Sequence, residues 1–190
     1  MTATAQRTLI LMLLAALMAA TRLNHFAPVP DASWAVFFIG GFALSTWTRW
    51  AFPVLMALAV LVDYAVITRS GASFFQHYCV SPAYWCLVPA YFVMWAGGMW
   101  LRRRGVGRDL RSLGLLAASL VVSAAVCHLI AQGSFYWVAV SAPTVAGWAQ
   151  NYLQFLPGYL QTAAMYVAGA TVVYVAAGAL SRNGRAVAAR

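Results

Sequence analysis

The sequence predicts an all-α integral membrane protein with six transmembrane helices in a single domain, residues 1–190. Three observations predict this class: 64% of the residues are apolar, only 8% are charged, and the apolar residues gather in six runs. Soluble domains average roughly 45–50% apolar and about 25% charged residues. A chain with so few charges cannot cover its folded surface with polar groups, so lipid is the expected solvent.

Each expected span is an apolar run bounded by Arg, Pro or Gly residues. A helix needs about 20 apolar residues to cross a bilayer core of about 30 Å, and fewer where polar flanks reach the interface. The expected spans are 8–22, 33–48, 51–68, 83–101, 112–131 and 156–180. The first has the length of a signal-peptide core, but no small-residue cleavage site followed by a polar start comes after it, so we count it as a span.

The arginines predict the orientation of the spans. All positive charge comes from twelve arginines, because the chain has no lysine. Six alternating spans place only Arg22 and Arg69 on one side and the other arginines on the opposite side. The positive-inside rule then puts both termini in the cytoplasm. The run RRRGVGRDLR at 102–111 is interpreted as a topology signal, with docking to an acidic lipid or to a partner as the alternative.

The short inventory of reactive groups excludes several functions. Without lysine there is no phosphate-binding loop of the Gly-Lys-Ser/Thr type and no lysine Schiff base, and without glutamate there is no zinc-peptidase helix of the His-Glu-x-x-His type. The predicted topology brings the remaining candidates into the outer half of the bundle. They are His25, Asp63, His77, Cys79, Cys86, Cys127 and His128. We therefore expect a functional site that faces outward.

Cys79 is the main candidate, within the segment SFFQHYCVSPAYWCLVP at 73–89. His77 and Arg69 are near it in sequence, and positive charge favours the thiolate form of a cysteine. One interpretation is a thiolate ligand or nucleophile; the other is a small apolar residue or half of a disulfide. A disulfide with Cys86 requires a bend at Pro82, since seven helical residues span about 10 Å. Cys127 remains a possible partner.

Asp63 is the one acid within an expected span. Burying a carboxylate there costs about 2.5–3.5 kcal/mol on insertion scales, so such a residue usually faces a cavity or a partner. We favour a cavity-facing acceptor for ligand groups over an acid that is hydrogen-bonded to a neighbouring helix. The aromatic residues of 74–85 and 135–148 fit an interfacial belt, or else the wall of a pocket for a large flat ligand. We expect a long loop from Gln132 to about Gln150 to form a lid over it.

Several features resemble the substrate-binding S-components of energy-coupling-factor (ECF) vitamin transporters. These features are the six spans, the outward aromatic residues and a first helix with Ala15-x-x-x-Ala19 and Ala16-x-x-x-Ala20. Two stretches, RLNHFAPVPDASWAVFFIGG at 22–41 and HYCVSPAY at 77–84, most resemble the BtuM-type cobalamin transporters of Gram-negative bacteria. The resemblance covers the whole chain in architecture and these two stretches as motifs.

The resemblance implies a bundle in the bacterial inner membrane that binds cobalamin in an outward-facing cavity and mediates its uptake. It implies that Cys79 ligates the cobalt, and that this residue is catalytic if the protein also removes cyanide from cyanocobalamin. A soft thiolate is a competent ligand for a transition metal. It also brings Asp63 and Tyr84 to the corrin amides, His25 to the rim of the pocket and His77 beside the thiolate. Arg69 or Arg22 would meet the nucleotide-loop phosphate.

The expected partners are cobalamin and the lipid bilayer, with no built-in cofactor and no nucleic acid. An ECF-type ATPase module either docks on the small-residue face of the first helix or is not needed, and the sequence leaves both open. The alternative function is a haem- or metal-binding electron-transfer protein with axial ligands among His25, His77 and His128. A structural membrane subunit without a ligand is the third interpretation.

Overall fold

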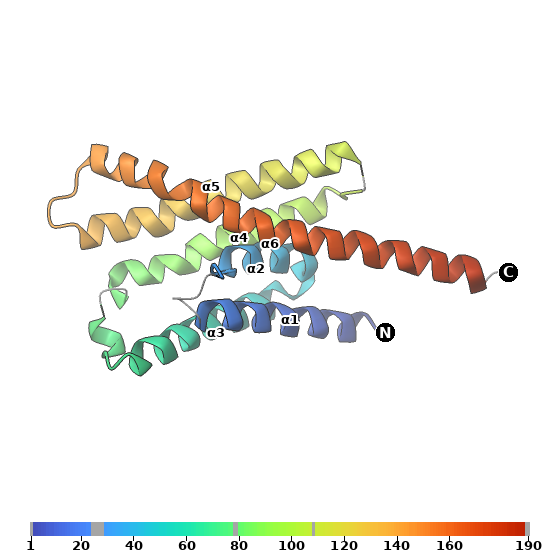
Figure 1. Ribbon diagram of the computed structural model, residues 1–190, viewed down its shortest axis with the longest axis horizontal. Coiled ribbons are helices and arrows are strands. Elements are labelled where there is room, and N and C mark those ends of the chain that lie inside the picture. The colour runs from blue at the N-terminus through green and yellow to red at the C-terminus, as the bar shows by residue number, and fades with distance from the viewer. Residues whose placement is uncertain (1, 24–28, 78–79, 108, 189–190) are drawn as a thin grey trace.

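The computed structural model describes residues 2–23, 29–77, 80–107 and 109–188, with side chains as far as 179. All regular structure in these ranges is helical, and they contain no strand (Figure 1). The helices are α1 Ala3–Leu23, α2 Ser33–Ala43, α3 Thr48–Arg69, α4 Leu87–Arg103, α5 Leu110–Ala139 and α6 Val145–Ala188. Short 3-10 helices are η1 Ser45–Trp47, η2 Phe74–Gln76 and η4 Pro82–Cys86. The predicted all-α class is confirmed.

Four segments of the described chain are long and apolar enough to cross a membrane. They are Ala3–Leu23, Ser45–Arg69, Leu110–Ala139 and Val145–Ala179. A helix also occupies each of the other two predicted runs, but α4 has 17 residues and α2 only 11. At 1.5 Å per residue α2 is about 16 Å long, roughly half the bilayer core. The protein is an α-helical membrane protein, while six complete crossings stay a prediction.

The prediction that 33–48 forms one continuous helix is wrong. The backbone N–H of Leu44 bonds the carbonyl of Gly40 at 2.7 Å, and the chain then turns through η1. Thr48 fixes this turn: its hydroxyl donates to the Ser45 carbonyl at 2.8 Å and accepts the indole N–H of Trp95 at 2.9 Å. Side-chain hydrogen bonds of this kind compete with helix continuation.

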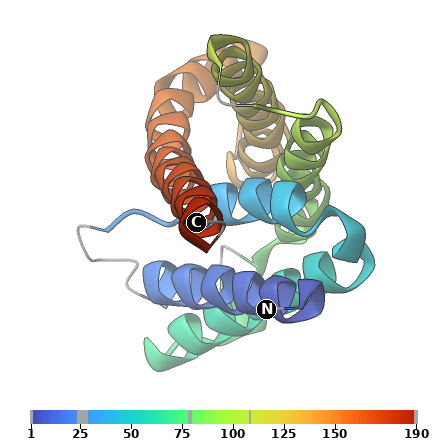
Figure 2. The same ribbon diagram turned by 90° about the vertical axis from the view of Figure 1, so that its right-hand side faces the viewer.

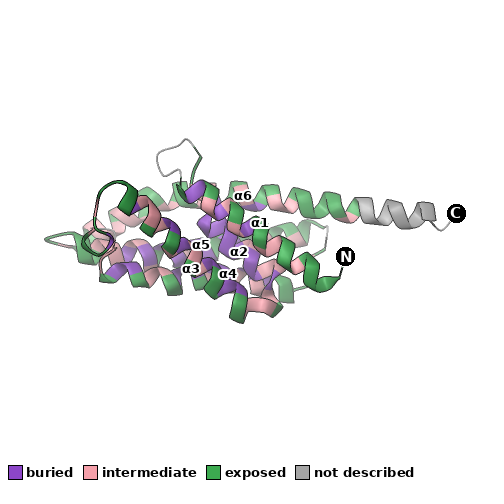
Figure 3. Cartoon of the chain, turned by 90° about the horizontal axis from the view of Figure 1, so that it is seen from below, coloured by how far each residue is buried: buried purple, intermediate pink, exposed green. Residues whose placement is uncertain are grey.

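Helix α2 forms the centre of the molecule (Figures 2 and 3). Eight of its 11 residues are buried, as expected for a helix that is apolar all round. The peripheral helices α1 and α6 instead expose apolar side chains; Leu13 on α1 is 61% exposed and Val172 on α6 is 68% exposed. Water would penalise such a surface, whereas lipid does not.

Two glycines allow α2 and α4 to pack in close contact. A Cβ on Gly41 would collide with the backbone carbonyl of Trp95, and a Cβ on Gly98 would collide with that of Phe38. Small residues at a helix crossing let the backbones approach closely, which is a common device in membrane bundles. Trp95 and Phe38 are buried beside this crossing.

The first residues of α1 and the last residues of α6 lie at the same end of the bundle (Figures 1 and 2). The α2–α3 and α4–α5 connections lie there too. We call this the arginine end, defined by Arg7, Arg49, Arg102, Arg103, Arg104 and Arg111. Arg22 and Arg69 stand instead at the last turns of α1 and α3. The grouping of these arginines agrees with the expected one; the cytoplasmic placement of this end stays a prediction.

The predicted long lid loop from Gln132 to about Gln150 is wrong. α5 continues to Ala139 and α6 begins at Val145, so only residues 140–144 connect them. The sixth helix was expected to begin near Pro157, but this proline lies inside α6 on an exposed face. Prolines are tolerated in membrane helices where the freed backbone groups find other partners. The aromatic residues between 132 and 150 therefore lie on α5 and α6 rather than on a lid loop.

Candidate functional site

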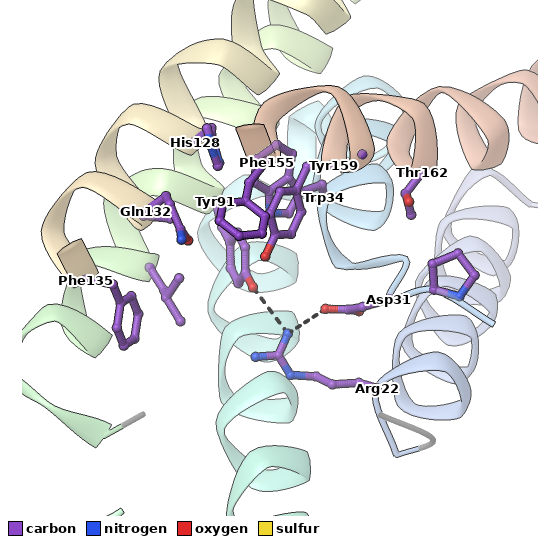
Figure 4. Close-up of a pocket in the computed structure, with 14 residues that line it drawn as sticks. Arg22, Asp31, Trp34, Tyr91, His128, Gln132, Phe135, Phe155, Tyr159 and Thr162 are labelled. Carbon is purple, nitrogen blue, oxygen red and sulfur yellow. Dashed lines mark hydrogen bonds and ion pairs between the residues drawn. The ribbon is translucent and has the colours of Figure 1, made fainter. Parts of the chain in front are cut away.

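A cavity of about 480 Å³ lies between the end of α1, the start of α2 and the facing parts of α4, α5 and α6 (Figure 4). Its floor is formed by Arg22, Asp31 and Tyr91, and its other walls combine aromatic and aliphatic residues with a few polar ones, which are His128, Gln132 and Thr162. Small-molecule sites are typically apolar cavities of about 300–1,000 Å³ with a few convergent polar groups. This cavity has those properties, so we take it as the candidate ligand site.

Arg22, in the last turn of α1, is 6% exposed. Its Nε and Nη2 donate to the two carboxylate oxygens of Asp63 on α3, at 2.6 and 2.7 Å. Its Nη1 lies within hydrogen-bond distance, 2.9–3.2 Å, of three further oxygens on α4 and at the start of α2. These acceptors are the Asp31 carboxylate, the Ser33 hydroxyl and the Tyr91 hydroxyl. One guanidinium therefore joins α1, α2, α3 and α4 at the floor of the cavity.

Asp63 accepts two hydrogen bonds from Arg22 but is not among the described groups that line the cavity. The hydroxyl of Tyr84, in η4, donates to the same carboxylate at 2.7 Å. Of the two interpretations of Asp63, the structure shows an acid that is hydrogen-bonded to neighbouring helices. Asp31 is the more accessible carboxylate, with a side chain 31% exposed against 15% for Asp63.

Stacked aromatic rings form the walls of the cavity. Trp34 stacks on Tyr159 with centroids 4.9 Å apart, which joins α2 to α6. Tyr91 stacks on Phe37 at 4.7 Å, and Phe135 and Phe155 complete the wall (Figure 4). Aromatic pairs of this geometry contribute about 0.5–1.5 kcal/mol beyond the area they bury. These stacked rings suit the flat face of an apolar ligand.

His128 lines the same cavity and is 1% exposed. Its Nε2 lies 3.2 Å from the Tyr152 carbonyl oxygen, so Nε2 must carry a hydrogen. In the neutral ring Nδ1 is then an acceptor. This hydrogen bond ties α5 to α6, which is a structural role for His128.

The described part of the loop before α4 packs close to the cavity. His25 and Cys79 lie outside the described residues. His77 is half-buried, and its carbonyl accepts the Val80 N–H at 2.8 Å. Val80 and two residues of the cavity wall pack against one small buried cluster. The wall residues are Leu87 and Phe135, and the cluster is Ile67, Phe74 and Tyr84.

The other candidates that the structure describes are Arg69, Cys86 and Cys127, and they do not line the cavity. Arg69 is exposed at the end of α3 and does not line the cavity in the described structure. Cys86 and Cys127 are both free thiols, so the described residues contain no disulfide between them. Cys127 is fully buried in the core, whereas Cys86 is half-buried.

Several cavity residues were missed from the sequence. Asp31, Trp34, Tyr91 and Tyr159 were not singled out, and Arg22 was considered only as a phosphate partner. One signal was present: Arg22 and Asp63 are opposite charges within apolar runs, each costly to insert without a partner. Both stand near the same end of their helices, so the pair could have been proposed.

Among the described residues, no three His, Cys, Asp or Glu side chains group closely enough to hold a metal ion by themselves. No protein-family model matches the chain, and no curated protein is significantly similar to it. The fold and the site therefore define a class only: an α-helical membrane protein with a ligand-sized aromatic cavity above a buried arginine–aspartate network.

Proposed function

We propose that this protein binds cobalamin in the cavity and mediates its uptake across the membrane, with Cys79 as an axial ligand of cobalt. The proposal rests on the resemblance of 22–41 and 77–84 to BtuM-type transporters. A thiolate is a suitable ligand for cobalt, and the corrin ring supplies the equatorial ligands. One cysteine is therefore sufficient, and a cluster of protein ligands is not required.

One structural observation carries the proposal further. Val80, the residue after Cys79, packs against the same buried cluster as Leu87 and Phe135, which line the cavity. The described residue that follows Cys79 in the chain therefore packs beside the cavity wall. The aromatic walls suit a macrocycle, and Asp31 and Tyr91 offer an acceptor and a hydroxyl to its peripheral amides.

The size of the cavity sets a requirement on the proposal. At about 480 Å³ it accommodates a small molecule but not a complete cobalamin. The proposal therefore requires that one edge of the corrin enters while the rest occupies the mouth, or that α6 moves away from α2 at the Trp34–Tyr159 stack. In this proposal Asp63 and Tyr84 act through Arg22, which lines the cavity and takes the phosphate contact in place of Arg69. The roles of His25 and His77 stay predictions.

Removal of cyanide from cyanocobalamin is the second proposed activity. Cyanide leaves with its bonding electron pair, and the cobalt passes from Co(III) to Co(II) as an external one-electron reductant supplies the electron. Cys79 would assist because a thiolate bound on one face of the corrin weakens the bond to the ligand on the other face.

The test is to purify the protein with cyanocobalamin supplied and to record its absorbance spectrum. We expect a bound corrinoid whose spectrum shows sulfur ligation, and loss of that signature together with cyanide loss in Cys79→Ala. Cys86→Ala is the matched control, because Cys86 is a free thiol on the same segment. An unchanged spectrum in Cys79→Ala would refute the ligand assignment, and a Soret band in place of a corrinoid spectrum would select the haem alternative.

A further inference from the structure

The arginine end carries more positive charge than the described structure neutralises. Both ion pairs found among the described side chains belong to Arg22, at the cavity. The single acid near the arginine end is Asp109, which accepts the backbone N–H of Ser112 at 3.2 Å as the cap of α5. The arginines at 102–104 and 111 are all exposed.

Four arginines at this end lie over aromatic rings. Arg104 lies 4.8 Å from the ring centroid of Trp100, and Arg49 lies 5.2 Å from that of Trp50. The other two pairs, at 5.4 and 5.9 Å, are Arg102 over Phe42 and Arg7 over Trp47. Trp50 is 64% exposed and Trp100 is 39% exposed, as residues of an interfacial belt are. A topology signal requires only charge, whereas these contacts also fix where each guanidinium lies.

A guanidinium that lies over a ring keeps its edge N–H groups available, and these match phosphate oxygens in a two-pronged geometry. We propose that the arginine end is a binding site for anionic phospholipid, with the headgroup at the α4–α5 corner, defined as Arg102, Arg103, Arg104 and Arg111. The first acyl carbons then lie against Trp100.

Lipid fits this surface better than a soluble acidic partner does. The corner is continuous with apolar surface. Phe42, whose ring lies under Arg102, meets Tyr174 of α6 edge-on with ring centroids 6.0 Å apart. Tyr174 is 56% exposed. A phosphate with an acyl chain satisfies both the charged and the apolar part of the surface, whereas a soluble anion satisfies only the first. Basic residues beside a membrane helix attract anionic lipid in this manner.

The test measures thermal unfolding of the full chain in a neutral detergent with added phosphatidylglycerol or phosphatidylcholine. Detergent removes any effect of membrane orientation on the comparison. We expect phosphatidylglycerol to raise the unfolding temperature by at least about 2 °C and phosphatidylcholine to have little effect. High salt should reduce the difference, since it screens exposed charges.

The variant with Arg102→Gln, Arg103→Gln and Arg104→Gln should lose the response to phosphatidylglycerol. Arg69→Gln is the matched control, because Arg69 is exposed at the opposite end, and it should keep the response. If the triple variant does not fold, Arg111→Gln and the salt dependence of the unchanged protein still test the site. Equal stabilisation by both lipids would overturn the proposal. So would equal stabilisation by inorganic phosphate or a poly-aspartate peptide.

Discussion

At the scale of single residues, the arginine–aspartate network at the cavity floor has unequal charges. One guanidinium, on Arg22, faces two carboxylates, those of Asp63 and Asp31. Asp63 takes the two shortest hydrogen bonds of Arg22. Asp31 accepts Arg22 at 3.2 Å and the backbone N–H and hydroxyl of Ser33 at 3.0 and 2.7 Å, and of the two carboxylates it is the one that lines the cavity. The two acids therefore have different expected roles: Asp63 positions Arg22, and Asp31 meets the ligand.

Asp63→Asn should destabilise the protein strongly. The substitution removes the carboxylate that makes the two shortest hydrogen bonds to Arg22 and leaves Asp31, at 3.2 Å, as its remaining ion-pair partner. Breaking a buried ion pair typically costs about 3–5 kcal/mol, and the contact with Asp31 keeps the expected loss at the lower end of that range. Tyr84→Phe, which removes only one hydrogen bond to the carboxylate, should cost less, about 1.5–3 kcal/mol. Unfolding in detergent measures both, with Ser73→Ala on the exposed loop as a control. A stability of Asp63→Asn equal to that of the unchanged protein would contradict this role.

Asp31→Asn should weaken ligand binding more than it weakens the fold. Replacing a charged acceptor by a neutral amide at the ligand costs about 1–2 kcal/mol, or roughly tenfold in the dissociation constant for cyanocobalamin. Titration followed by absorbance measures this change. If affinity is unchanged while stability falls, Asp31 serves only the network. This prediction depends on the proposed function.

At the scale of helices, the α2–α4 crossing sets the position of the cavity wall. Trp34 and Phe37 are on α2 and Tyr91 is on α4, so the spacing of these two helices fixes the distances between the stacked rings. The close approach depends on Gly41 and Gly98, because a side chain at either position would collide with backbone on the other helix.

Gly98→Ala should destabilise the protein by about 1–3 kcal/mol, because backbone atoms cannot move aside as a flexible side chain can. Gly169→Ala is the matched control: no neighbour lies within 4 Å of a Cβ built there. Alanine normally stabilises a helix by about 0.5–1 kcal/mol relative to glycine, so the control should be neutral or more stable. The same sign for both substitutions, measured by thermal unfolding, would argue against the tight crossing.

The start of α5 should respond to acid. Hydrogen bonds from the hydroxyl and the backbone N–H of Ser112 hold the pKa of the exposed Asp109 carboxyl below its usual range. Because this pKa is lowered in the folded state, the ionised cap stabilises the fold when the pH is above the usual carboxyl pKa. The stabilisation is lost as the pH falls through the lowered pKa. Asp109→Ala should therefore be less stable than the unchanged protein at neutral pH and equal to it in strong acid. A constant difference across that range would show that the charge of Asp109 does not matter.

At the scale of the whole molecule, the number of crossings determines which ends face which side. Six crossings place the α3–α4 and α5–α6 connections on the side opposite to the arginine end. In a variant without native cysteines, Ser73→Cys and Ser141→Cys should then react with an impermeant maleimide on intact cells. Gly107→Cys should react only after permeabilisation. Labelling of all three positions from outside would exclude the predicted topology.

The sequence by itself determined what depends on composition and local pattern. The membrane class, the presence of six helical segments and the separation of Arg22 and Asp63 from the arginine end all follow from hydropathy and charge order, which are read along the chain. Helix ends were less predictable. Pro157 suggested a start for α6 that the helix passes through, and the run at 33–48 hid the turn at Leu44.

Only the tertiary structure decided which groups meet. The helical period tells which face a residue occupies, but not which neighbour that face contacts. The bidentate pairing of Arg22 with Asp63, the burial of α2 on all sides and the stack of Trp34 on Tyr159 all depend on how the helices are arranged in space. Buried charges and polar groups must find partners, and the position of those partners is set by packing between segments far apart in the chain.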